Sequence, residues 1–204
     1  MKIIKLPALK ARSSFFALAV ILALVFLSTL ATAQNRWDVS ITPAVNFPTK
    51  NLGNAKLKTG FGADVTIAYR LTKQLGIYGG WGWNKFSSAQ SFAGKNMEFV
   101  ETGYSVGLQF SQPIASTKIK FVLGAGAIYK HIETENSKGD AINDTGHGWG
   151  WEALTGVSFP LGKHFNFIPT IKYRELSRNI QILTATTPVS LHYISVGIGF
   201  NYTF

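Results

Sequence analysis

Residues 191–204, LHYISVGIGFNYTF, decide how the rest of the chain is read. The apolar or aromatic side chains fall on every second position, namely Ile194, Val196, Ile198, Phe200, Tyr202 and Phe204. The residues between them are mostly small or polar. An alternation with a period of two is typical of a β-strand whose two faces meet different surroundings. The sequence therefore ends in a predicted strand with one apolar face.

Seven further stretches of the chain alternate in the same way. They cover residues 37–47, 60–71, 75–86, 99–111, 118–132, 148–160 and 164–174. Strands of this length match what a tilted strand needs to cross a bilayer. Strands of globular proteins are usually nearer five or six residues. The pattern predicts eight long strands.

The connections between these stretches alternate in length. Residues 72–74, 112–117 and 161–163 are short connections, whereas residues 48–59, 87–98, 133–147 and 177–190 are long and polar. Bacterial barrels have short periplasmic turns and longer external loops. Eight strands with both ends in the periplasm give three short and four long connections. We therefore predict an all-β fold, an eight-stranded antiparallel up-and-down transmembrane β-barrel.

The first 33 residues have the features of a secretory signal peptide. Four basic residues precede an uncharged stretch at residues 15–30, and Ala31-Thr32-Ala33 supplies the small residues that a signal peptidase needs. A membrane-anchoring helix is the alternative. We expect cleavage before Gln34, so that residues 1–33 are removed and residues 34–204 form one barrel domain.

Composition excludes several classes of protein. Without the four basic residues of the leader, 16 Lys and Arg face 10 Asp and Glu, so the net charge falls from +10 to +6. No cluster of basic residues remains, which argues against a nucleic-acid partner. The chain contains no Cys, so the fold has no disulfide bond.

The final strand and its C-terminal Phe resemble the last strand of small bacterial outer-membrane β-barrel proteins. This broad family includes the OmpA transmembrane domain, OmpX, OmpW and the opacity-type proteins. The resemblance implies an outer-membrane location. It also implies that Ile198, Phe200, Tyr202 and Phe204 are read by the barrel-assembly machinery.

The polar face of the strands is expected to line the barrel interior. A soluble lipocalin-like barrel would instead bury the apolar face. Folding neighbouring strands about their connections pairs acids with bases, as a narrow interior requires, because unpaired buried charges are costly. The predicted pairs are Asp38 with Arg70, Glu101 with Lys130, and Glu152 with Lys172.

Aromatic residues gather near the strand ends on the apolar face. Membrane barrels carry such girdles at both membrane–water interfaces. A core rich in tryptophan is the alternative. The predicted interface aromatics are Trp37, Tyr69, Trp81, Trp83, Trp149, Trp151 and Tyr173.

Three functions remain open for such a barrel. The interior of eight strands is just wide enough for its own side chains, which favours a non-enzymatic scaffold that presents external loops. A narrow channel for small or hydrophobic molecules, as in OmpW-like members, is the alternative. A lipid A-modifying enzyme with a Ser/His/Glu constellation is disfavoured, because His192 and Ser195 point to opposite faces of a strand and His147 has no hydroxyl beside it on its own face. No catalytic residues are therefore expected.

No metal site or cofactor is expected either. His131 and His164 have no metal partners at ligand spacing along the chain, and the acidic loop 133–147 lacks the calcium-loop pattern. The expected partners are outer-membrane lipid and lipopolysaccharide, which the lysines of the first two long loops could meet, and the barrel-assembly machinery. These lysines are Lys50, Lys56, Lys58 and Lys95. The protein is expected to be a monomer.

Overall fold

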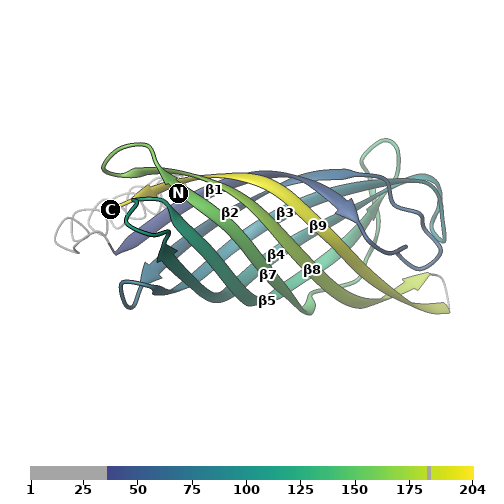
Figure 1. The fold of residues 1–204 in the computed structure, drawn as a ribbon. Coiled ribbons are helices and arrows are strands. Elements are labelled where there is room, and N and C mark those ends of the chain that lie inside the picture. The colour runs from purple at the N-terminus through teal and green to yellow at the C-terminus, as the bar shows by residue number, and fades with distance from the viewer. Residues whose placement is uncertain (1–35, 183–184) are drawn as a thin grey trace, which may run out of the picture. The chain divides into compact units, whose positions relative to one another are not determined.

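The computed structural model describes residues 36–182 and 185–204, and the predicted signal peptide lies outside these residues (Figure 1). All regular structure in the described chain is β. The strands are β1 (Trp37–Pro48), β2 (Gly60–Arg70), β3 (Leu75–Ser91), β4 (Gly94–Pro113), β5 (Lys120–Glu135), β6 (Ala141–Asp144), β7 (Gly148–Pro160), β8 (Phe165–Ile182) and β9 (Ala185–Thr203). None of the described residues forms a helix long and apolar enough to cross a membrane.

Eight of these strands close into a ring, which confirms the predicted barrel. Each ring strand pairs antiparallel with its neighbours in the chain, and β5 pairs directly with β7. The first and last strands close the ring, with Val39 opposite Tyr202 and Val45 opposite Val196. The short β6 pairs with the end of β5 outside the ring. Closure leaves no free sheet edge in the lipid, where unpaired backbone groups would be costly.

Two of the predicted long loops are largely strand. The β3–β4 hairpin continues until Ser91 pairs with Gly94, and the β8–β9 hairpin continues until Ile182 pairs with Ala185. Antiparallel neighbours go on satisfying each other's backbone hydrogen bonds above the membrane. Polar composition alone does not end such a pairing, so the predicted loops 87–98 and 177–190 were too long.

The two ends of the barrel differ. Short turns join the strands at one end, and residues 49–59, the extended hairpins and β6 lie at the other, which we call the long-loop end (Figure 1). Between them, the outward face is apolar, with Tyr104, Val106 and Leu108 on β4 each more than half exposed. This face is the predicted lipid-facing surface.

The pattern of faces reverses toward the long-loop end. On β4 the outward Tyr104 and Val106 give way to the outward Glu98, whereas Phe99 and Met97 point inward and are buried. The same reversal occurs on β5 and β9. The barrel therefore has a membrane half, with apolar residues outside, and an external half, with apolar residues inside.

Candidate functional site

Charged side chains fill the middle of the barrel. Three acids and three bases lie buried there: Asp64, Glu101, Glu152, Lys130, Lys172 and Arg174. Their formal charges cancel. Each of them points inward because it alternates with an outward apolar neighbour on its strand.

Asp64 and Glu152 both bind Arg174. The Asp64 carboxylate accepts hydrogen bonds from Arg174 Nη2 at 2.7 Å and from Lys172 Nζ at 2.9 Å. Glu152 accepts from Arg174 Nε at 2.8 Å and from the Tyr78 hydroxyl at 2.8 Å. Asp64 lies on β2 and Arg174 on β8, so these bonds reach across the lumen rather than between neighbouring strands.

Glu101 is the centre of a second group. Its Oε2 accepts from Lys130 Nζ at 2.9 Å, from the Tyr193 hydroxyl at 2.7 Å and from Asn84 Nδ2 at 2.7 Å. Arg174 Nη1 donates to the Tyr193 hydroxyl at 3.2 Å and so joins the two groups. Buried charges are tolerated only when they are paired and hydrogen-bonded in this way.

The network takes in every strand of the ring. Asn46 of β1 donates to Asn84 at 2.8 Å and accepts from Ser195 of β9 at 2.6 Å. The contributing side chains are Asn46, Asp64, Tyr78, Asn84, Glu101, Lys130, Glu152, Lys172, Arg174, Tyr193 and Ser195. One continuous polar layer therefore crosses the lumen from wall to wall.

Inward glycines make room for this layer. A Cβ on Gly82 would lie 2.2 Å from Asp64 Oδ1, and one on Gly126 would lie 2.6 Å from the Tyr78 hydroxyl. These two glycines therefore leave the space that the Asp64 and Tyr78 side chains occupy.

The structure places the three predicted charge pairs differently. Asp38 and Arg70 form two hydrogen bonds, at 2.8 and 2.9 Å, near the short turns. Glu101 and Lys130 meet as described above. Lys172 Nζ is 3.8 Å from Glu152, which has Arg174 as its closer partner. Arg174 stands directly opposite Glu152 in the register, whereas Lys172 stands opposite Leu154.

Sequence reasoning missed the partners that meet across the lumen. Asp64 was not among the predicted pairs, and Tyr78 and Tyr193 were not singled out. The sequence did indicate that these residues point inward, because they alternate with outward apolar residues on their strands. Folding hairpins pairs only neighbouring strands, so it could not bring Asp64 to Arg174.

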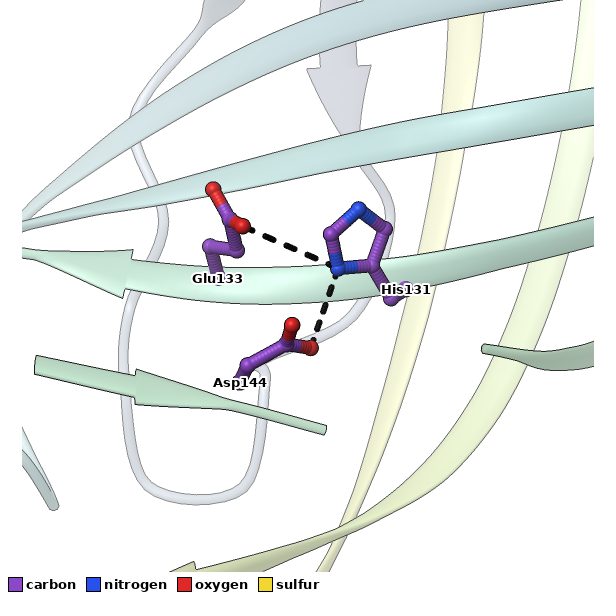
Figure 2. Close-up of side chains that lie close together, drawn as sticks. All are labelled: His131, Glu133 and Asp144. Carbon is purple, nitrogen blue, oxygen red and sulfur yellow. Dashed lines mark hydrogen bonds and ion pairs between the residues drawn. The ribbon is translucent and has the colours of Figure 1, made fainter. Parts of the chain in front are cut away.

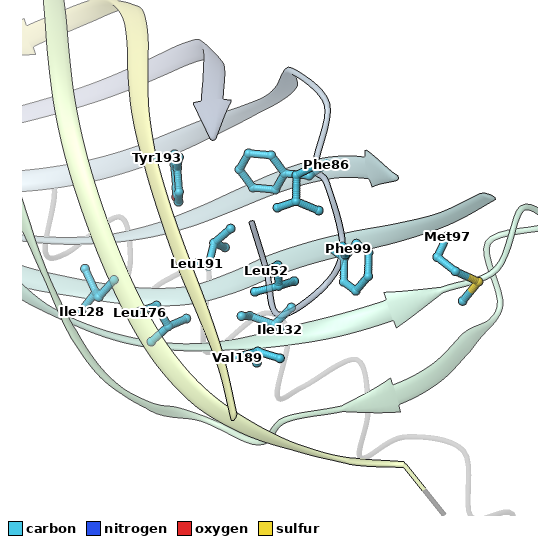
Figure 3. Close-up of a cluster of buried hydrophobic side chains, with 12 residues drawn as sticks. Leu52, Phe86, Met97, Phe99, Ile128, Ile132, Leu176, Val189, Leu191 and Tyr193 are labelled. Carbon is cyan, nitrogen blue, oxygen red and sulfur yellow. The ribbon is translucent and has the colours of Figure 1, made fainter. Parts of the chain in front are cut away.

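An apolar cluster fills the interior of the external half (Figure 3). It consists of Leu52, Ala55, Leu57, Phe86, Met97, Phe99, Ile128, Ile132, Leu176, Val189, Leu191 and Tyr193. Residues 49–59 fold into the mouth of the barrel, and Leu52 and Ala55 are 0% exposed. Backbone bonds between Leu52 and Ala55 close this loop, and Lys58 N–H donates to Ser87 O at 2.8 Å. The first long loop is therefore a packed cap.

At the opposite end the lumen is polar and partly open. A hollow of about 60 Å³ is lined by residues that include Asp38, Arg70, Gln109 and Asn201. Its volume is that of a few water molecules. None of the residues of the charged layer lines this hollow, so the hollow ends before that layer.

Comparison with known proteins identifies the fold and the family. Residues 17–204 match the outer membrane protein beta-barrel domain. The chain belongs to this family. No curated protein sequence matches the chain.

Three solved structures share the fold of this outer-membrane barrel. Neisserial surface protein A is similar with a TM-score of 0.60 and 16% identity over 82% of this chain and 97% of that one. OprG from Pseudomonas aeruginosa is similar with a TM-score of 0.55 and 14% identity, over 83% of this chain and 96% of that one. Outer membrane protein W from E. coli is similar with a TM-score of 0.51 and 17% identity, over 83% of this chain and 98% of that one. At these identities the likeness concerns the fold alone.

The predicted interface aromatics of the outer-membrane barrel all lie on its outward face. Trp37 packs on Tyr69 with ring centroids 4.9 Å apart near the short turns, and Trp151 packs on Tyr173 at 5.2 Å toward the other end. Trp149 is 67% exposed. The remaining two, Trp81 and Trp83, stand opposite Val65 and Ala63 on β2.

The predicted insertion signal occupies the end of β9. Ile198 and Phe200 face outward and are about half exposed. The Tyr202 ring packs on Phe165 at 4.9 Å. Phe204 follows directly after the last residue of the strand.

His192 lies on the outward face of β9 in a small polar group. Its Nε2 is 3.1 Å from Ser190 Oγ, and its Nδ1 is 3.0 Å from the Tyr173 hydroxyl and 3.5 Å from Glu175 Oε2. Sequence reasoning compared His192 with Ser195, which points inward. The hydroxyl that meets the histidine is two residues before it, on the same face.

His131 lies on the outward face of β5 beside two carboxylates (Figure 2). Its Nδ1 is 3.0 Å from Asp144 Oδ1 and 3.9 Å from Glu133 Oε1. The chain spacing of these residues gave no metal-site prediction. The β5–β6 pairing, which sets Glu133 opposite Asp144, brings them together.

Proposed function

We propose that this outer-membrane barrel is a non-enzymatic scaffold that holds external loops at the cell surface. The observation that carries the proposal is the continuous polar layer across the lumen, which the apolar cap covers. Solvated ions would have to displace paired buried charges and then a packed apolar cluster to pass. A closed interior leaves the external surface as the part available for recognition.

A measurement of ion conductance tests this proposal. The purified barrel in planar lipid bilayers is expected to give no conductance steps. The double variant Leu52→Ser with Phe99→Ser removes apolar contacts from the cap and from the β4 side of the apolar cluster. It is expected to stay closed, because the charged layer remains. Regular conductance steps from the unaltered protein would support the alternative, a narrow channel. Uptake of apolar solutes into vesicles would support the hydrophobic form of that channel.

The external half suits contact with the polar surface of the outer membrane. Lys56 and Lys58 of the cap loop are exposed, and Lys95 is exposed at the tip of the β3–β4 hairpin. Lysines near an anionic surface attract phosphate groups. We include lipopolysaccharide among the proposed partners on this ground. We also propose that the barrel works as a monomer, because the ring closes within one chain.

The final strand is proposed to be the segment that the barrel-assembly machinery reads. β9 closes the ring by pairing with β1, so the barrel is incomplete until it docks. Deleting Phe204 is expected to reduce the amount of folded barrel in the outer membrane while leaving export unchanged. Equal loss of periplasmic and membrane-bound protein would contradict this role.

The group around His192 favours a second candidate function, hydrolysis of an ester. A hydroxyl within reach of a histidine, which a further group orients, is the arrangement of an activated nucleophile. In such a reaction Ser190 Oγ would attack the ester carbonyl, His192 would pass the proton to the leaving alcohol, and water would release the acid. Covalent labelling of Ser190 by a fluorophosphonate, lost in Ser190→Ala and in His192→Gln, would favour this function over the scaffold. Absence of labelling would exclude it.

A further inference from the structure

We propose that His131, Glu133 and Asp144 form a surface site for a divalent transition-metal ion such as Zn²⁺. Its three side chains lie close together on the β5–β6 hairpin (Figure 2). They are on the outer face of the external half, because His131 and Glu133 alternate with the buried, inward Lys130, Ile132 and Thr134. The site does not depend on the scaffold role or on a channel.

The β5–β6 hairpin sets the donor atoms at one point. His131 and Glu133 are two residues apart on β5 and so share a face. Asp144 stands opposite Glu133 in the register of the hairpin. One nitrogen of the histidine and one oxygen of each carboxylate lie within 4.8 Å of one another. Ligands of a tetrahedral Zn²⁺ at about 2.0–2.2 Å from the metal lie roughly 3.3–3.6 Å apart. Small side-chain rotations would therefore bring the three donors onto one ion.

The surrounding backbone holds Asp144 in place. Gly146 N–H donates to Asp144 Oδ1 at 2.8 Å, which orients the carboxylate. Ile132 N–H donates to Thr145 Oγ1 at 2.9 Å, and Thr145 N–H donates to Ile132 O at 3.1 Å. Groups that orient a metal ligand in this way raise affinity, because less ordering remains to be done on binding.

A second histidine stands beside the first. The His147 ring stacks on His131 with centroids 4.4 Å apart and an angle of 19° between the planes. This stacking brings a second imidazole, the commonest side-chain ligand of transition metals, next to the three donors. A turn of His147 would make it a fourth ligand, and water could fill that position instead.

The local charge also favours a cation. Glu98 and Glu135 lie on the same outer face, and a single base, Lys85, bridges both of them at 2.6 and 3.0 Å. Glu133 and Asp144 add two further negative charges. The chain as a whole is basic, with a formal net charge of +10, so this patch of carboxylates has the opposite sign to the overall charge.

The donor set decides between classes of cation. Imidazole with two carboxylates suits Zn²⁺ and its neighbours in the first transition row. Ca²⁺ and Mg²⁺ prefer sites made of oxygen alone and usually six or more ligands. We therefore expect Zn²⁺ to bind, and Ca²⁺ and Mg²⁺ to compete poorly.

Isothermal titration of the folded, metal-free barrel in detergent with ZnCl₂ tests the site. One ion per chain is expected to bind with saturation, and tenfold Ca²⁺ is expected to leave the binding curve unchanged. His131→Gln and Asp144→Asn are each expected to weaken binding at least tenfold, and His147→Gln by less.

Asp140→Asn is the matched control. Asp140 belongs to the same acidic loop but accepts a hydrogen bond from Asn136 Nδ2 instead of facing His131. This variant loses the same charge as Asp144→Asn and is expected to bind Zn²⁺ as the unaltered protein does. Resistance of each variant to SDS before heating verifies its fold. Absence of saturable binding, or equal losses in the Asp140 and Asp144 variants, would overturn the proposal.

Discussion

The membrane half and the external half of the barrel use the same strands with opposite faces. On β4, Val106 and Leu108 point out to lipid while Glu101 points into the lumen; a few residues earlier, Glu98 points out and Phe99 points in. The antiparallel register with both neighbouring strands continues without a shift between these positions. What changes is the solvent outside the wall, from hydrocarbon to water. The interior changes as well. Polar side chains point inward where hydrocarbon lies outside, and apolar side chains point inward where water lies outside.

The two interiors stabilise the barrel by different means. The membrane half has a polar layer in which direction and pairing matter, and removing one charge leaves another unpaired. The external half has an apolar cluster in which volume matters, as in the core of a soluble protein. This difference leads to four predictions.

Replacing Arg174 should have the largest effect. Arg174→Leu leaves Asp64 and Glu152 buried without their closest base, and loss of one partner from a buried ionic network typically costs about 3–5 kcal/mol. Urea unfolding of the barrel in lipid vesicles, followed by tryptophan fluorescence, measures the change. If Arg174→Leu were as stable as the unaltered barrel, the polar layer would not be a source of stability in the membrane half.

A charge on the outer face should distinguish the two halves next. Leu108→Arg places a guanidinium against the hydrocarbon, which costs roughly 2–4 kcal/mol near the middle of the membrane. Ser177→Arg, also outward but in the external half, should change stability by less than about 0.5 kcal/mol. The same urea titration compares them. Equal effects would place the membrane boundary elsewhere on the barrel.

Much of this arrangement could be predicted from the sequence, and one part could not. The alternation of residues such as Val196, Ile198 and Phe200 is enough to predict strands, their number and the lipid-facing side. It holds only where lipid lies outside. Phe86, Phe99 and Leu191 follow the same alternation but point inward. The sequence does not show at which residue the surroundings of the barrel change from lipid to water. The reversal therefore escaped prediction.

The charged residues of the lumen also divide into those whose partners could be predicted and those whose partners could not. Asp38 with Arg70 and Glu101 with Lys130 lie on neighbouring strands, so folding each hairpin brings them close. Asp64 reaches Arg174 across the lumen, where distance depends on the closure of the whole ring. Predicting contacts across the ring requires the shear and tilt of the barrel, and the local sequence pattern does not specify either quantity.

Loosening the cap should destabilise the external half alone. Leu52→Ala removes a fully buried side chain from the apolar cluster, and such changes usually cost at least about 2 kcal/mol. The expected result is faster trypsin cleavage at Lys56 and Lys58 with the SDS-resistant barrel retained. Leu161→Ala is the control, because Leu161 is 64% exposed in a short turn. Loss of the whole barrel in Leu52→Ala would show that the halves do not unfold separately.

The smallest effect should come from an ion pair on the outer face of the external half, and it gives the sharpest comparison. Lys85 and Glu135 are partly exposed and 3.0 Å apart, and Lys130 and Glu101 are fully buried at 2.9 Å. Distance alone would make the two pairs equal. Water screens the first pair, so a double-mutant cycle with alanine should give a coupling below about 1 kcal/mol that shrinks further in 1 M salt. The buried pair should give a larger coupling that salt leaves nearly unchanged. Equal couplings would mean that water reaches the charged layer, and the interior of the membrane half would then be wetter than its hydrogen bonds imply.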